Sequence, residues 1–176
     1  MSETVIAIPT LETERLRLRA PKASDFEAYA DFRTSPRALY AGGPFSRAEA
    51  FEQMAALVGH WLLRGYGRWM VAGKGDDRPL GVVGLYYPDD WLEPEIAWAV
   101  FAEAEGKGIA QEAARASLRY AYETLGWTTA VSLIDPANTR SAALAERLGA
   151  TREGVFHHPS LGAMDVWRHP GPGEAA

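Results

Sequence analysis

The chain has 176 residues, of which 47% are hydrophobic and 23% charged, and 18 Lys and Arg against 23 Asp and Glu give a net charge of −5. This composition predicts one globular domain, residues 1–170, followed by a small, flexible C-terminal tail, residues 171–176. The mild acidity argues against nucleic acid or an anionic membrane as a partner, and the lack of cysteine excludes disulfides, thiolate metal sites and a cysteine nucleophile.

The first ten residues, MSETVIAIPT, lack the basic and apolar regions of a secretory signal. No segment approaches the roughly 20 apolar residues that a membrane-spanning helix needs. We therefore expect a cytoplasmic protein without a membrane partner.

Hydrophobic periodicity predicts an alternation of strands and helices along the chain. Two of the helices begin with capping residues, Ser46 with Glu49 and Asn138, and glycines follow their last turns. In chain order we predict a strand at 15–20, helices at 24–35 and 46–65, strands at 66–74, 80–88 and 94–101, a helix at 109–125, a strand at 127–134, a helix at 138–149, and strands at 151–156 and 164–169.

This order predicts an α/β fold with a mixed, mostly antiparallel central sheet and helices on both faces. The three consecutive strands from residue 66 to residue 101 favour an antiparallel meander. The strand–helix–strand step that follows should make its two strands parallel, with a right-handed crossover.

A glycine turn, EGKG, separates the strand at 94–101 from the helix that follows it. Gly106 and Gly108 can adopt positive φ, and the first amides of a helix have no intrahelical partner, so this turn could cradle a phosphate. Lys107 could add a positive charge. The same glycines could also form only a tight connection, and the spacing matches neither GxxxxGK[ST] nor GxGxxG.

Polar residues near the predicted parallel strands are candidates for chemistry. Glu95 begins a strand of alternating apolar residues, where it is either an exposed strand end or a general base with a raised pKa facing a cleft. Asn138 is a good N-cap, and Ser141 lies on the same side of the first turn. Such helix starts, following neighbouring parallel strands, describe a ligand crevice.

The histidines near the C-terminus invite a metal site, but their spacing matches no recognised ligand set. These residues are His157, His158 and His169, together with Asp165. We therefore expect no metal. Most tryptophans should be core, and Trp91 is the best candidate for a cleft rim because it follows PDD.

Three segments together resemble the GNAT superfamily of acetyl-CoA-dependent N-acetyltransferases, and more narrowly its ribosomal-protein-alanine N-acetyltransferase branch. They are TERLRLRAPKASDFEAYADF near the start, EIAWAVFAEAEGKGIAQEAA, and NTRSAALAERLGA. The resemblance extends to the MDVW strand and so covers nearly the whole chain. It implies the acyl-CoA N-acyltransferase fold and acetyl-CoA as co-substrate.

The sequence departs from the family pattern at two positions. The family's loop reads Gln or Arg, two residues, Gly, one residue, then Gly or Ala, which maps onto Glu105, Gly108 and Ala110. An acid therefore stands at 105 where a basic or amide residue is usual, which puts the affinity for CoA in doubt. Ala150 replaces a common aromatic residue, at a position that we interpret as packing.

The resemblance also implies roles for individual residues. Glu95, directly or through water, would take the proton of the amine, and Ser141 would assist the departing thiolate; Tyr122 is a weaker candidate acid. The pantetheine arm would lie along the strand, and the diphosphate on the loop amides, with Asn138 near the arm. The implied cofactor-binding residues are Trp98, Ala99, Val100, Gly106, Lys107, Gly108, Ile109, Ala110 and Asn138.

We therefore expect transfer of an acetyl group from acetyl-CoA to a primary amine, by direct attack, on a protein N-terminus or a small molecule. The alternatives are a catalytically weak acyl-CoA-binding module of the same fold and an unrelated phosphate-binding α/β protein. The acceptor should be selected by the loops AGGPFS and HHPSLGAM, whose residues do not identify it. The sequence leaves open whether the protein forms a homodimer.

Overall fold

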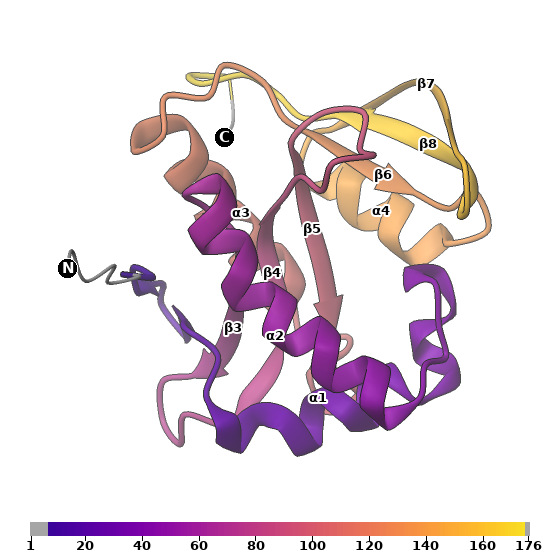
Figure 1. Ribbon diagram of the computed structural model, residues 1–176. Helices are drawn as coiled ribbons and strands as arrows, with labels where there is room; N and C mark the ends of the chain where they lie inside the picture. The colour runs from indigo at the N-terminus through magenta and orange to yellow at the C-terminus, as the bar shows by residue number, and fades with distance from the viewer. Residues whose placement is uncertain (1–6, 175–176) are drawn as a thin grey trace, which may run out of the picture.

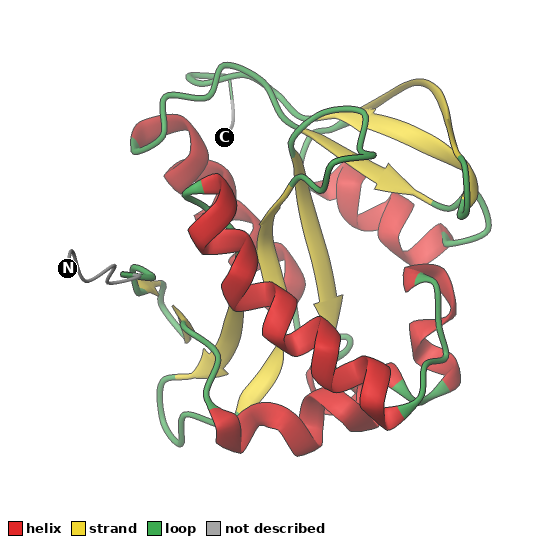
Figure 2. Ribbon diagram, viewed as in Figure 1, coloured by secondary structure: helices red, strands yellow, loops and turns green. Residues whose placement is uncertain are grey.

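The computed structural model describes residues 7–174, which form one eight-stranded sheet with helices on both of its faces (Figures 1 and 2). The strand order is β1-β2-β3-β4-β5-β6-β8-β7, and neighbouring strands are antiparallel except for the parallel pair β5 and β6. The mixed, mostly antiparallel sheet predicted from the sequence is confirmed. The strands are β1 Leu11–Glu12, β2 Leu16–Arg19, β3 Arg68–Gly73, β4 Pro79–Tyr86, β5 Glu95–Val100, β6 Val131–Ile134, β7 Thr151–His158 and β8 Gly162–Arg168; the helices are α1 Phe26–Arg33, α2 Arg47–Arg64, α3 Ile109–Glu123 and α4 Thr139–Arg147, with short 3-10 helices η1 Ala23–Asp25, η2 Pro36–Ala41 and η3 Ala102–Ala104.

The predicted meander and crossover are both present. Strands β3, β4 and β5 pair in antiparallel succession, and α3 carries the chain from β5 to the parallel strand β6. Strand β1 was not predicted, because its two residues are too short to show a period.

Capping residues start two of the helices as the sequence predicts. Ser46 accepts a hydrogen bond from the Glu49 amide while the Glu49 side chain accepts from the Ser46 amide, which completes the capping box of α2. Asn138 accepts from the Ser141 amide at the start of α4. These local bonds fix where each helix begins.

The two faces of the sheet hold separate cores because side chains alternate along each strand. Met70 and Val82 pack against α1 and α2, whereas Val71 and Val83 pack against α3. In Figure 1, α2 crosses the front of the sheet and α3 lies behind it. Helix α4 covers the far half of the sheet, where Ala145 packs with Trp167 of β8.

Strands β5 and β6 form a fork that opens in the middle of the sheet. Their only parallel register pair is Glu95 with Val131. Beside it, the Ser132 hydroxyl donates to the Ile96 carbonyl at 2.6 Å and accepts from His169 Nε2 at 2.8 Å. Beyond this buried connection the strands diverge, as Figure 1 shows, so one edge of β5 is left without a neighbouring strand.

The C-terminal segment forms a turn within the described residues. The Glu174 amide donates to the Gly171 carbonyl, and the Glu174 carboxylate accepts from the Gly171 amide at 3.3 Å. Residues 175–176 of the predicted tail lie outside the described part. Within residues 7–174, no helix has both the length and the apolar character needed to cross a bilayer.

Candidate active site

The open edge of β5 presents backbone groups to the fork. The Phe101 amide donates to Leu80 on β4, whereas the Ile96 carbonyl faces β6. Backbone groups alternate in direction along an extended strand, so Trp98 and Val100 also direct their N–H and C=O groups into the fork. An extended ligand could pair there as an added strand does.

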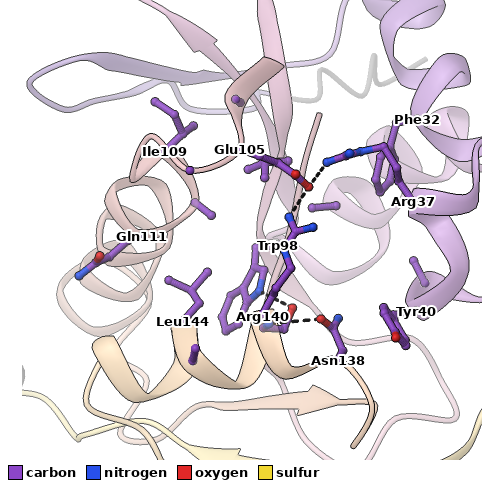
Figure 3. A pocket seen from close by; sticks show the side chains of 18 of the residues that line it. Phe32, Arg37, Tyr40, Trp98, Glu105, Ile109, Gln111, Asn138, Arg140 and Leu144 are labelled. Carbon is purple, nitrogen blue, oxygen red and sulfur yellow. Dashed lines mark hydrogen bonds and ion pairs between the residues drawn. The ribbon is translucent and has the colours of Figure 1, made fainter. Parts of the chain in front are cut away.

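A first cavity of about 860 Å³ extends from this edge to the start of α3 (Figure 3). Its walls come from η2, β5, the glycine turn, α3 and α4. The predicted cofactor residues Trp98, Ala99, Val100, Gly106, Gly108, Ile109, Ala110 and Asn138 all line it.

Uncapped backbone amides form one end of this cavity. Gly106 and Gly108 have φ of +70° and +74°, which other residues adopt only with strain, and Gly108 caps α3 without any side-chain hydrogen bond. The first amides of α3 therefore keep free donors at the positive end of the helix dipole. Behind the turn, Arg15 donates to the Lys107 carbonyl at 2.9 Å and pairs with Glu112.

Glu105, the acid that departs from the expected loop pattern, forms ion pairs with two arginines. Figure 3 shows its carboxylate between Arg37 of η2 and Arg140 of α4, which reach it from different walls of the cavity. The local charge is therefore positive, with two guanidinium groups against one carboxylate. Lys107 is exposed and does not line the cavity, so its charge would reach a ligand there only from outside the cavity.

Asn138 and Ser141 lie at the start of α4 and line the first cavity together with β5. The Trp98 indole N–H donates to the Ser141 hydroxyl oxygen at 3.2 Å. Because that oxygen accepts this bond, the hydroxyl proton stays free to be donated elsewhere. Asn138 both caps α4 and lines the cavity, so it can contact a ligand there as well as cap the helix.

A second cavity, of about 810 Å³, lies on the α1 and α2 side of the sheet and meets the first at the fork. It is lined by Glu95, by the loop after β4 with Trp91, and by both loops that the sequence assigns to acceptor selection. The residues that line both cavities are Tyr40, Ala41, Trp98, Ala99, Asn138 and Ser141. Two ligands in the two cavities would therefore meet beside Trp98 and Ser141.

Glu95 is 5% exposed and lies where the fork closes. One carboxylate oxygen accepts the Leu133 amide at 2.8 Å, and the side chain lines the second cavity. Burial raises the pKa of Glu95 to about 7, although the bond from Leu133 acts in the opposite direction. A carboxylate with this pKa exchanges protons near neutral pH, as a general base must.

The histidines take structural positions. His60 Nδ1 donates to the Tyr66 carbonyl and its Nε2 accepts from the Tyr87 amide, so both nitrogens are engaged. His158 Nε2 donates to Asp90, and burial lowers the pKa of His169 to about 4.

The four residues considered as metal ligands make separate contacts. His157 is exposed, His158 pairs with Asp90, Asp165 pairs with Arg152, and His169 bonds Ser132. Over residues 7–174, no group of three or more His, Cys, Asp or Glu side chains is arranged to hold a metal ion.

Sequence reasoning missed the arginines that line the first cavity. Arg37 and Arg140 follow no motif and meet Glu105 only through the fold. Tyr122, the weaker candidate acid, donates its hydroxyl to the Pro170 carbonyl at 2.7 Å and lines neither cavity.

Comparison with known proteins identifies relatives over most of the chain. The family of acetyltransferase (GNAT) domains matches residues 15–151. The crystal structure of the acetyltransferase from Agrobacterium tumefaciens strain C58 is 34% identical, with a TM-score of 0.86 over 97% of this chain and 99% of that one. The uncharacterized N-acetyltransferase p20 of Bacillus licheniformis is 26% identical over 84% of this chain and 85% of its own. The ribosomal-protein-S5-alanine acetyltransferase of Vibrio fischeri shares the fold at 17% identity, with a TM-score of 0.69 over 96% of this chain and all of that one.

Proposed function

The chain belongs to the family of acetyltransferase (GNAT) domains, and from this we propose that it transfers an acetyl group from acetyl-CoA to a primary amine bound in the second cavity. The observation that carries the proposal is the pair of cavities that meet at the β5 fork, beside Trp98 and Ser141. One cavity ends in free helix amides and arginines, and the other contains a buried carboxylate with a pKa near neutrality.

The residues present fit acetyl-CoA in the first cavity. The uncapped amides at Gly108 to Ala110 are suited to a diphosphate, and Arg37 and Arg140 can exchange Glu105 for phosphate oxygens. The free backbone groups of Trp98 and Val100 can pair with the amides of the pantetheine arm. Acetyl-CoA supplies a thioester whose acyl carbon is open to attack by a neutral amine.

Residues of the chain would then accept the proton of the amine and stabilise the departing thiolate. An alkylammonium ion with a pKa near 10 must lose a proton before its nitrogen can attack, and Glu95 would accept this proton, directly or through water. The nitrogen–carbon bond forms as the carbon–sulfur bond breaks. Ser141, whose hydroxyl proton is free, would donate a hydrogen bond to the departing thiolate.

A thiol-release assay tests the proposal. The protein is incubated with acetyl-CoA and a panel of amines, and free thiol is followed together with the mass gain of each amine. We expect thiol release above background with at least one amine, and a lower kcat for Ser141→Ala. Measurable CoA binding without thiol release from any amine would favour an acyl-CoA-binding module, and wild-type kcat in Ser141→Ala would remove Ser141 from the chemistry.

A further inference from the structure

Two half-buried arginines in the second cavity form no ion pair within residues 7–174, and a third, Arg64, is exposed. Arg33 of α1 and Arg68 of β3 both line this cavity. Neither forms an ion pair with a carboxylate of residues 7–174, although the other arginines of β2, η2 and β8 do. A half-buried guanidinium group without a counter-charge is costly, and two together repel each other.

Arg68 projects from the same face of the sheet as Glu95. The register pairs Arg68 with Gly84 and Gly84 with Ala97, and Tyr86 with Glu95. The Arg68 guanidinium lies 4.1 Å from the centre of the Tyr86 ring and so extends toward the Glu95 end of the strands. No side-chain hydrogen bond to another described residue occupies this guanidinium group.

The residues next to Arg68 and Glu95 on this face of the sheet are Gly84, Tyr86 and Ala97. Gly84 has φ of +149°, and an added Cβ would come within 2.7 Å of the Gly67 carbonyl oxygen and 2.8 Å of the Arg68 Cα. Its neighbour on β5 is Ala97, and beside this pair the Tyr86 ring lies on the same face, opposite Glu95 and in contact with the Arg68 guanidinium. By standard strand spacings, the Cα atoms of Arg68 and Glu95 are about 10 Å apart across the sheet and about 7 Å along it.

Arg33 reaches the same cavity from α1. Its Nε donates to Gln53, and its guanidinium carbon lies 4.4 Å from the centre of the Phe45 ring. Burial, and in smaller part the charge of Arg68, lowers the pKa of Arg33. The remaining guanidinium nitrogens have no partner among the described side chains.

Among residues 7–174, no carboxylate that lines the cavity forms an ion pair with these arginines, although the charge of Arg68 acts to lower the pKa of Glu95. Asp90 pairs with His158, Asp135 accepts the Ala137 amide, and Glu95 accepts the Leu133 amide. Asp89 is exposed. The cavity therefore holds a proton acceptor, Glu95, and two half-buried arginines without an ion pair, Arg68 and Arg33.

We propose that the acceptor is an anionic amine, in which the amino group lies at Glu95 and a carboxylate or similar oxyanion binds Arg68 and Arg33. This inference rests on the proposed function, because it assigns the acceptor class of the same site. Amino acids and N-termini of peptides with an acidic side chain share this chemistry, whereas polyamines lack the anion. Arginine is suited to bind the anion because its planar guanidinium group binds a carboxylate through two parallel hydrogen bonds.

Matched amines test the proposal. We would compare each anionic amine with the amine that lacks its carboxylate: glycine with methylamine, β-alanine with ethylamine, γ-aminobutyrate with propylamine, and phenylalanine with phenethylamine. A peptide arm compares amidated Ser-Asp with amidated Ser-Asn and so separates a peptide acceptor from a free amino acid. Wild type, Arg68→Gln and Arg33→Gln are measured, with Arg119→Gln as control. Arg119 is exposed on α3, lines neither cavity, and its change removes the same charge.

In wild type, the anionic member of at least one pair should have a kcat/KM higher by about 10- to 100-fold, the range of a charge-assisted bidentate contact. Arg68→Gln should remove most of this preference, chiefly through KM, and Arg119→Gln should keep it. The proposal is overturned if the uncharged members are equal or better substrates, or if Arg68→Gln lowers both members of a pair by the same factor.

Binding to the CoA-loaded protein separates failure of this inference from failure of the proposed function. Calorimetric titration should show tighter binding of the anionic member even where no acetyl transfer occurs. Thiol release without any anionic preference would refute the acceptor class alone. Preferential binding of the anionic amine without thiol release would support the acceptor class and refute the proposed activity, and the absence of both effects would overturn this inference.

Discussion

Glu95 combines a structural bond with a carboxylate whose pKa burial raises to about 7. For an acid with a folded-state pKa above its unfolded value, the stabilising contribution is complete below the unfolded pKa of 4.5 and is lost as the pH rises through 7. We expect wild type to lose about 2 to 3 kcal/mol of unfolding free energy from this group between pH 5 and pH 8. Urea unfolding at several pH values, with Glu95→Gln beside wild type, measures it.

In the Glu95→Gln variant this loss should disappear, because the amide stays neutral and its oxygen can still accept the Leu133 amide. Over the same pH range the activity of wild type should rise while its stability falls. Wild-type kcat should rise with pH through about 7, and Glu95→Gln should lose about 100-fold and show no such rise. An unchanged pH–rate profile in this variant would mean that Glu95 is not the base.

Glu105 pairs with Arg37 and Arg140, so in the proposed complex it would compete with the phosphate groups of CoA for both arginines. Glu105→Gln should free both arginines and lower the Kd for CoA by about 3- to 10-fold at low salt, with a smaller effect at high salt because the site is open to solvent. Isothermal titration at two salt concentrations measures the change.

Glu103→Gln is the control for Glu105→Gln, since Glu103 lies in the neighbouring 3-10 helix and pairs with Arg78 outside the cavity. A higher Kd in Glu105→Gln, with Glu103→Gln unchanged, would show instead that the carboxylate holds the arginines in position for the ligand.

At the scale of elements, the start of α3 should bind phosphate through the shape of the glycine turn. Gly108 and Gly126 both have positive φ, +74° and +70°, at opposite ends of this helix. Alanine at either position should cost about 1 kcal/mol of unfolding free energy. Only Gly108→Ala should also raise the Kd for CoA, because relief of its strain displaces the amides beside the cavity.

At neither position would an added Cβ clash with the described residues. An added Cβ would lie 3.4 Å from Arg15 Nη2, an ordinary contact, whereas nothing lies within 4 Å of a Cβ at Gly126. Any loss of CoA binding therefore follows from backbone geometry. Equal CoA affinity in Gly108→Ala and wild type would contradict a role for this turn in binding.

At the scale of the whole molecule, acetyl-CoA would contact η2, β5, α3 and α4, which lie on both sides of the fork between β5 and β6. A ligand that binds only the folded state at 100 times its Kd adds about 2.7 kcal/mol, or roughly 5–10 °C in Tm for a chain of this size. We expect such a shift with acetyl-CoA and none with ATP or NAD at equal concentration. Equal protection by nucleotides would favour an unrelated phosphate-binding protein.

Much of the fold could be predicted because its signals are local. The Ser46–Glu49 capping box, the Asn138 cap and the alternation in β3, β4 and β5 each span only a few residues, and the structure confirms them. The family match confirms the resemblance to N-acetyltransferases. The roles of Glu95 and Ser141 remain predictions, supported by burial, hydrogen bonding and position at the fork.

By itself, the sequence determined the family, the glycine turn and the order of the elements other than β1 and the 3-10 helices, because hydrophobic periodicity and capping signals span only a few residues. Only the tertiary structure decided which charges meet. Arg140 reaches Glu105 across 35 residues of chain, and Arg33 and Arg68 come from different elements to one cavity. Charge pairing depends on distance in space, which a sequence pattern does not contain, so the acid that departed from the expected loop acquired its two cationic partners only on folding.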